Sequence, residues 1–205
     1  ALYDLAGAHD LATRLSRREE PRFGATWPTG AHRKVWELAH PRPYRLLVDR
    51  WSQERGIDPH WVWAIMREES GFDAKVESWA NAVGLMQIIL PTAESLVRGT
   101  DIEPTRANLK RPAVAIELGT KYLGKLFGQH PVYPLASAGY NAGGGAVKRW
   151  RRQMGDVELD LFVERIPFRE ARGYAKRVSR SLARYQWLYG GDEILALPME
   201  PPGAP

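Results

Sequence analysis

The chain has 205 residues, of which 44% are hydrophobic and 26% are charged. This length and balance indicate a folded domain with a substantial core and exclude a disordered chain. No apolar run approaches the roughly 20 residues that a membrane-spanning helix needs, and the absence of cysteine excludes disulfides, thiolate metal sites and cysteine nucleophiles.

The formal net charge is +5. This excess fits a solvated basic surface, and it also suits a polyanionic partner such as nucleic acid, anionic lipid or an acidic cell wall. Basic residues are densest at 148–152 and at 165–184. The chain starts without a methionine or the pattern of a signal peptide, so we expect a processed or truncated part of a longer precursor.

Helical spacing dominates the chain, and strand-like alternation is scarce. The spacing predicts a helix over 2–18, and the proline, glycine and polar residues of 19–30 predict a linker. We expect residues 1–38 to be an N-terminal helical segment and linker, and residues 39–205 to form the main domain.

From residue 39 onward the pattern predicts a succession of helices. They cover residues 43–55, 58–70, 91–97, 112–127, 134–140, 145–153 and 169–189. Asp58 and Pro59 are a typical helix start, an N-cap followed by proline at the first helical position. The segment from Leu197 holds four of the 15 prolines and is expected to be irregular. The predicted fold class is therefore mainly α.

The helix predicted over 58–70 carries the most informative carboxylate. At about 100° per residue, Glu69 lies on the same face as the apolar Ile65 and Met66, whereas Glu68 is turned away by about 100°. Burial in an apolar environment raises the pKa of a carboxyl group, and a carboxyl that keeps its proton near neutral pH can act as a general acid. The spacing alone leaves open that Glu69 pairs with an arginine or faces solvent at the helix end.

Three further segments carry polar groups in unusual surroundings. Gln87 lies in an apolar run, Tyr140 and Asn141 precede three glycines, and Glu170 and Tyr174 share one helix face. Such groups suit sugar recognition, since hydroxyl and N-acetyl groups are their natural partners. Taken alone, the Gln87 segment and the Glu170–Tyr174 helix fit a structural role better, and the Tyr140-Asn141 segment fits either role.

No cofactor or metal site is predicted. The histidines lack the spacing of metal ligands, and the sequence has no calcium-binding loop, no phosphate-binding loop and no G-x-S-x-G motif of a serine hydrolase.

Four motifs follow one another along the chain. The first runs from Ala64 to Phe72, and the second is Ser78 with Gly84-Leu85-Met86-Gln87-Ile88 and then Pro91-Thr92-Ala93. The third is Tyr140-Asn141-Ala142-Gly143 with Gly145 and Val147, and the fourth is Ile166-Pro167-Phe168 with Glu170 and Tyr174. Taken in order, these motifs resemble the soluble lytic murein transglycosylase family, whose catalytic domain has a helical, goose-type lysozyme-like fold, and Gly119 to Leu123 resembles a further stretch of that family. The resemblance covers about residues 39–189, and residues 1–38 are expected to be the end of a preceding helical domain.

The chain departs from the family pattern at several positions. Asn81 stands where glycine is usual, the proline at 91 is displaced by one place, and Ala115 replaces a common asparagine. Gly139 and Ala171 are further departures. None of them touches Glu69, so the fine shape of the sugar subsites is affected rather than the reaction.

The resemblance implies cleavage of the β-1,4 bond between N-acetylmuramic acid and N-acetylglucosamine in bacterial peptidoglycan, with formation of 1,6-anhydromuramoyl ends. It implies that Glu69 is the acid and base and that Tyr140 hydrogen-bonds near it and helps to set its protonation. The implied substrate-binding residues are Ser70, Ser78, Met86, Gln87, Asn141, Glu170 and Tyr174.

The implied partner is the peptidoglycan glycan strand rather than nucleic acid, and the implied location is the periplasm or cell envelope. A lysozyme-type hydrolase and a non-catalytic peptidoglycan-binding module remain as alternatives. The hydrolase would need a second acidic group to activate water, and the binding module would dispense with the acid.

Overall fold

The computed structural model describes residues 7–19 and 25–191. This part of the chain is helical and contains no strand, apart from isolated bridges that join Val83 to Glu77 and to Ile88. The predicted mainly α fold is therefore confirmed. The helices are α2 (His9–Glu19), α3 (Gly30–Ala39), α4 (Arg45–Arg55), α5 (Pro59–Glu69), α6 (Leu90–Leu96), α7 (Arg106–Leu109), α8 (Pro112–Gln129), α9 (Tyr133–Ala142), α10 (Gly144–Met154), α11 (Leu159–Arg165) and α12 (Arg169–Tyr189).

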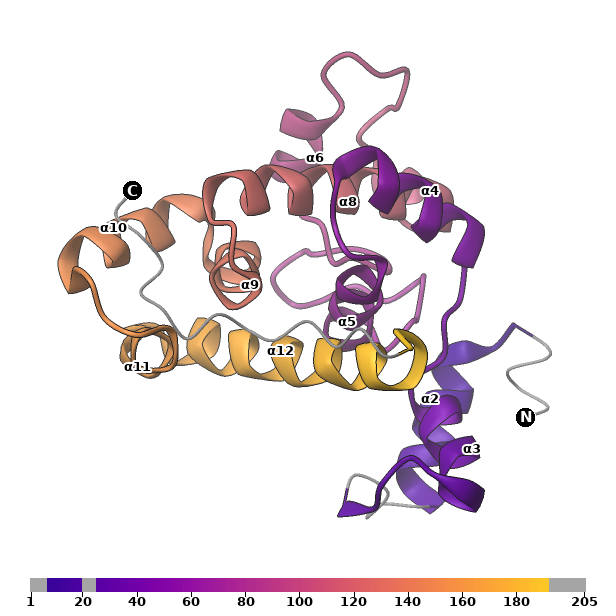
Figure 1. Cartoon of the computed structure of the whole chain (residues 1–205). Helices are drawn as coiled ribbons and strands as arrows, with labels where there is room; N and C mark the ends of the chain where they lie inside the picture. Colours follow the sequence, from indigo (N-terminus) through magenta and orange to yellow (C-terminus); the bar gives the residue numbers. More distant parts are fainter. Residues whose placement is uncertain (1–6, 20–24, 192–205) are drawn as a thin grey trace.

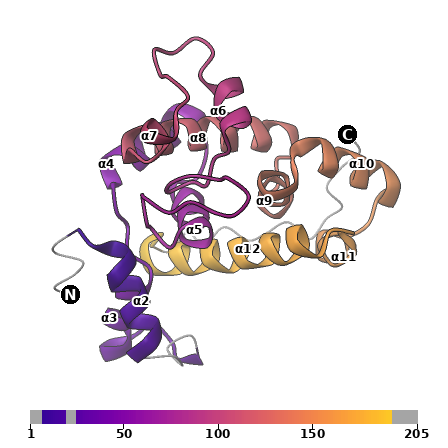
Figure 2. The same ribbon diagram turned by 180° about the vertical axis from the view of Figure 1, so that it is seen from behind.

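Helix α5 is at the centre of the molecule, between the long helix α12 on one side and α4 and α8 on the other (Figures 1 and 2). Every side chain from Trp61 to Met66 is at most 1% exposed. Asp58 starts the helix as predicted, because its carboxylate accepts a hydrogen bond from the backbone N–H of His60 at 2.8 Å. The burial extends around the whole helix, beyond the single apolar face that the sequence indicated.

Helices α2 and α3 form a pair that lies beside the C-terminal end of α12 (Figure 1). Tyr185 and Tyr189 of α12 donate hydrogen bonds to the backbone carbonyls of Pro41 at 2.8 Å and His40 at 2.9 Å. Arg33 of α3 donates in return to the carbonyl of Leu188 at 2.8 Å. The boundary near residue 38 stays a prediction, although it falls at the end of α3.

The sequence did not indicate α3, α7 or α11 as helices. The two short ones have seven residues or fewer, and helices of that length form because of tertiary packing rather than propensity. The expected helix over 2–18 begins at His9 within the described residues. Residues 1–6 and the expected irregular segment from Leu197 lie outside them. No helix in the described ranges is long and apolar enough to span a bilayer.

Candidate active site

Glu69 is the last residue of α5, and its carboxylate faces α12. The hydroxyl of Tyr174, in the second turn of α12, donates a hydrogen bond to Glu69 Oε1 at 2.5 Å. The helix ends here because Ser70 leaves the helical conformation and the next two residues, Gly71 and Phe72, adopt positive φ angles of 58° and 72°. The burial of α5 and the turn at Gly71 and Phe72 together fix the position of Glu69 at the end of this helix.

Burial raises the pKa of Glu69 from 4.5 to about 7. The hydrogen bond from Tyr174 and the positive charge of Arg177 act in the opposite direction, and the negative charges of Glu170 and Glu68 add to the increase. A pKa near 7 leaves both protonation states accessible at neutral pH. One carboxyl group can therefore donate a proton in one step and accept a proton in the next.

Glu68 has different partners, although it precedes Glu69 directly. Ser181 of α12 donates a hydrogen bond to Glu68 Oε1 at 2.6 Å, and Arg177 Nε lies 3.6 Å from Glu68 Oε2. The Glu68 side chain is only 12% exposed. The sequence indicated burial of only one of the two carboxylates, whereas the structure buries most of the Glu68 side chain as well, because α12 packs against this end of α5.

Tyr140 lies close enough to Glu69 for the carboxylate charge to act on it. Burial, followed by the charge of Glu69, raises the Tyr140 pKa well above its usual value. Its hydroxyl donates to the backbone carbonyl of Met86 at 2.7 Å, and its ring lies 5.2 Å from that of Tyr122. The resemblance implied that Tyr140 hydrogen-bonds near Glu69. In this structure Tyr174 makes the direct hydrogen bond to Glu69, whereas Tyr140 bonds to the nearby carbonyl of Met86.

Several of the expected substrate-binding side chains hold the loop over residues 71–89 together. The Ser70 hydroxyl donates to Leu85 O at 2.9 Å, and the Gln87 amide donates to Gly84 O at 3.0 Å. The Ser78 hydroxyl accepts from the backbone N–H of Ala82 at 3.1 Å. These bonds fix the loop beside Glu69, and contact of these residues with a glycan stays a prediction.

Gly84 and Asn81 are two of the loop positions with a positive φ angle. Gly84 has a φ of 75°, and a Cβ there would lie 2.3 Å from the carbonyl oxygen of Leu109, so only glycine fits. Asn81 has a φ of 64°, which asparagine tolerates better than most residues, and its amide oxygen accepts from Arg106 at 2.7 Å. The departure from the family glycine at Asn81 thus preserves the turn.

The remaining expected site residues lie in two places. Met86 is fully buried and packs beside Gly119 of α8, where a Cβ would clash with its side chain. The Asn141 amide, at the end of α9, donates to Glu170 Oε1 at 3.4 Å on the exposed side of the site. The structure therefore brings Asn141, Glu170 and Tyr174 to one region and places the Met86 side chain in the core.

Arg177 and Ser181 were not identified as site residues from the sequence. They follow Tyr174 by three and seven residues, so at about 100° per residue they share its face of α12. The helical spacing that places Glu170 and Tyr174 on one face also places Arg177 and Ser181 there. This spacing is the feature of the sequence that could have identified them as site residues. Among the described residues, no group of three or more acidic or histidine side chains is arranged to hold a metal ion.

The chain matches a known protein family. The family model described as the transglycosylase SLT domain matches residues 47–163, which include the Glu69 motif, the loop and Tyr140. The chain belongs to this family. Glu170 and Tyr174, which belong to α12, lie beyond the matched residues.

The relatives of this SLT domain are larger proteins. The soluble lytic murein transglycosylase of Salmonella typhimurium is 37% identical over 171 residues, which cover 79% of this chain and 26% of that protein. The chain thus spans about a quarter to a half of the length of the curated relatives that it matches.

Two solved structures have the same fold. The 70 kDa soluble lytic transglycosylase of Escherichia coli matches with a TM-score of 0.80 and 30% identity, over 93% of this chain and 30% of that one. An inactive glutamate-to-glutamine mutant of the Pseudomonas aeruginosa lytic transglycosylase Slt matches with a TM-score of 0.71 and 32% identity, over 77% of this chain and 26% of that one. The expected lysozyme-like helical fold is confirmed.

Proposed function

We propose that this SLT domain cleaves the β-1,4 bond between N-acetylmuramic acid and N-acetylglucosamine in bacterial peptidoglycan and leaves 1,6-anhydromuramoyl ends. The observation that carries the proposal is Glu69, a largely buried carboxyl with a pKa of about 7 and a tyrosine hydroxyl as its partner. The names of the relatives support the reaction. The inactive mutant in which glutamine replaces one glutamate supports the need for such a carboxyl.

In the first step, protonated Glu69 donates its proton to the oxygen that links the two sugars. The bond between that oxygen and C1 of the muramoyl unit breaks, and positive charge develops at C1. The N-acetyl group of the substrate stabilises this charge, as in other substrate-assisted glycosidases.

In the second step, the Glu69 carboxylate accepts the proton of the muramoyl 6-hydroxyl as that oxygen bonds to C1. Glu69 returns to its protonated form, and the product is an internal anhydride without added water. Because the 6-hydroxyl belongs to the same sugar, its effective concentration exceeds that of a competing solvent molecule.

The surrounding residues have supporting roles in this proposal. Tyr174 orients the Glu69 carboxylate, and Tyr140 joins α9 to the loop through the carbonyl of Met86. Asn141 and Glu170 lie at the rim of the site, where they are available to hydroxyl and amide groups of the sugars. Peptidoglycan as substrate implies action in the periplasm or cell envelope.

A lysozyme-type hydrolase is the second candidate, and one observation favours it. The negative charge of Glu170 contributes to the raised pKa of Glu69, so a second carboxylate lies near the proposed acid. A hydrolase would use Glu170 to activate water. A binding module without activity would have no use for a carboxyl with this pKa.

Mass spectrometry of the products from purified peptidoglycan tests the proposal. We expect 1,6-anhydro ends, whose mass is one water lower than that of hydrolysis products. We expect the same products from Glu170→Gln, at a rate within about tenfold of the unmodified chain. Products with mostly free reducing ends, together with loss of activity in Glu170→Gln, would support the hydrolase instead.

A further inference from the structure

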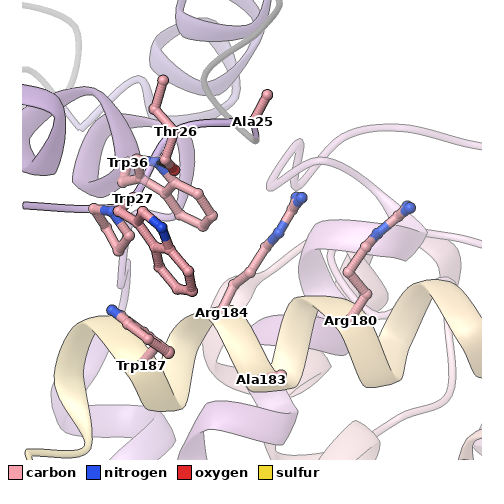
Figure 3. A pocket seen from close by; sticks show the side chains of 9 residues that line it. Ala25, Thr26, Trp27, Trp36, Arg180, Ala183, Arg184 and Trp187 are labelled. Carbon is pink, nitrogen blue, oxygen red and sulfur yellow. Dashed lines mark hydrogen bonds between the residues drawn. The ribbon is translucent and has the colours of Figure 1, made fainter.

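A separate pocket of about 420 Å³ lies between the segment over 25–36 and the C-terminal half of α12 (Figure 3). Trp27, Trp36 and Trp187 gather at one end of it, while Arg184 and Arg180 extend from α12 along the other (Figure 3). This volume is within the range of small-molecule binding sites. The described lining residues include two arginines and no acidic residue.

Two of the three tryptophans of this pocket are unusually exposed, whereas Trp36 is buried. Trp27 is 68% exposed and Trp187 is 44% exposed, and their ring centroids are 5.0 Å apart. A sugar ring does not fit between rings at this distance, so the outer face of Trp27 is the surface available for stacking. Such a face suits the apolar C–H side of a pyranose, whereas the indole N–H can donate to a hydroxyl.

The two arginines of the pocket supply positive charge, which a binding site for a neutral sugar does not need. Arg180 has no ion pair with any of the residues that the structure describes, and the Arg184 guanidinium lies 5.2 Å from the ring of Trp36. A guanidinium group is well suited to bind a carboxylate in two-pronged geometry. The pocket therefore combines an aromatic face with the guanidinium of Arg180, which can bind the carboxylate of an acidic sugar derivative.

The position of the pocket connects it to the candidate active site. Arg177, Arg180, Arg184 and Trp187 are spaced by three or four residues, so they form one stripe along α12. The stripe starts at Arg177, whose charge acts on Glu69, and ends in the pocket. From Tyr174 to Trp187 the helix rises by about 20 Å, which separates the pocket from the reacting bond.

From these observations we propose that the pocket of Trp27, Trp187, Arg180 and Arg184 is a second binding site for a glycan that carries carboxylates. It holds a part of the strand remote from the bond at Glu69, and the arginine stripe of α12 guides the strand between the two. The identification of the ligand rests on the proposed function, since peptidoglycan is a glycan with lactyl and peptide carboxylates.

Binding to insoluble peptidoglycan tests this site without any need for cleavage. The assay uses the full chain with Glu69→Gln, and Trp27→Ala and Arg180→Gln are added separately. We expect each to weaken binding roughly three- to tenfold. Leu46→Ala, at a leucine that is 86% exposed on α4, and Arg152→Gln, at an exposed arginine of α10, are the matched controls and should bind as before.

A neutral N-acetylglucosamine oligomer of similar length provides the comparison for charge. We expect it to bind more weakly than peptidoglycan fragments, and its binding should be insensitive to Arg180→Gln. Equal binding of both glycans, with no effect of Arg180→Gln on either, would overturn the role of the carboxylates.

Cleavage by chains that retain Glu69 separates this proposal from the proposed function. On fragments too short to reach the pocket, Trp27→Ala should cleave as fast as the unmodified chain. Absence of cleavage by the unmodified chain, with the binding differences intact, would reject the reaction and retain the site. Unchanged binding of peptidoglycan by Trp27→Ala would reject the site. A change in the oligomeric state of Trp27→Ala would also reject it, because the face would then be a protein interface.

Discussion

Two neighbouring carboxylates at the end of α5 have contrasting environments. Glu68 accepts a hydrogen bond from Ser181 and lies beside the guanidinium of Arg177, so its negative charge is compensated. Glu69 accepts a hydrogen bond from the neutral hydroxyl of Tyr174, and burial raises its pKa to about 7. Adjacent positions on one buried helix thus acquire different chemistry, because another helix brings a different partner to each of them.

The largest expected effect comes from exchanging these carboxylates for amides. Glu69→Gln keeps the shape of the side chain but cannot exchange a proton, so turnover of peptidoglycan should fall at least about 10²–10⁴-fold. Glu68→Gln should lower turnover by no more than about fivefold, since a glutamine still accepts from Ser181. Equal losses of turnover in folded Glu68→Gln and Glu69→Gln would show that the two carboxylates do not differ in function. Substantial turnover by Glu69→Gln would refute the assignment of Glu69 as the acid and base.

Removal of the hydroxyl that bonds to Glu69 should have a smaller effect with a distinct pH signature. In the unmodified chain we expect the rate to fall as the pH rises through about 7, because the acid loses its proton. The Tyr174 bond lowers the Glu69 pKa, so Tyr174→Phe should move this fall to higher pH. The maximal rate should drop about tenfold. A complete pH–rate profile with an unshifted basic limb would show that the hydroxyl does not tune Glu69.

Tyr140→Phe should slow the reaction by about fivefold and leave glycan binding in place. The lost hydrogen bond ends on the neutral carbonyl of Met86, and a neutral bond contributes about 1 kcal/mol. The measurement is the pH–rate profile together with the affinity of the glycan, with Tyr174→Phe as the comparison. An unchanged rate and profile would make Tyr140 purely structural.

The smallest expected effect concerns stability. The Glu69 pKa is higher in the folded chain, so the folded state binds this proton more tightly than the unfolded state. The contribution of Glu69 to the free energy of unfolding therefore falls as the pH rises from about 4.5 to about 7 and does not change above that range. Glu69→Gln does not titrate, so above pH 7 its melting temperature should exceed that of the unmodified chain by roughly 5 °C.

The thermal comparison is made at several pH values between 4 and 8. The difference in melting temperature should vanish near pH 4, where Glu69 is protonated in both states. Glu68→Gln is the control, and it should show no such gain, because its carboxylate has a cationic partner. A constant difference at every pH would mean that the gain has another origin.

Much of the helical structure could be predicted from the sequence, because apolar residues that recur at helical spacing over a long segment are compatible with few other structures. The helix over 169–189 was predicted with the bounds that α12 has. The burial of Glu69 was indicated by its apolar neighbours at helical spacing, and it is confirmed. The short helices α7 and α11 and the helix α3 could not be found in this way, since packing against the rest of the chain decides whether such segments form.

The sequence alone determined the mainly α fold, the family motifs and the candidate acid, because periodicity and motif order are properties of the chain itself. The identity of the side chain that contacts Glu69 depends on how the helices pack, since Tyr174 is 105 residues away along the chain. Packing also joins Ser70 to the loop through Leu85, holds Ser78 and Gln87 in hydrogen bonds within the loop, and places Trp27 beside Trp187. Contacts between distant segments depend on how helices pack, and no local pattern encodes the partner of a given residue.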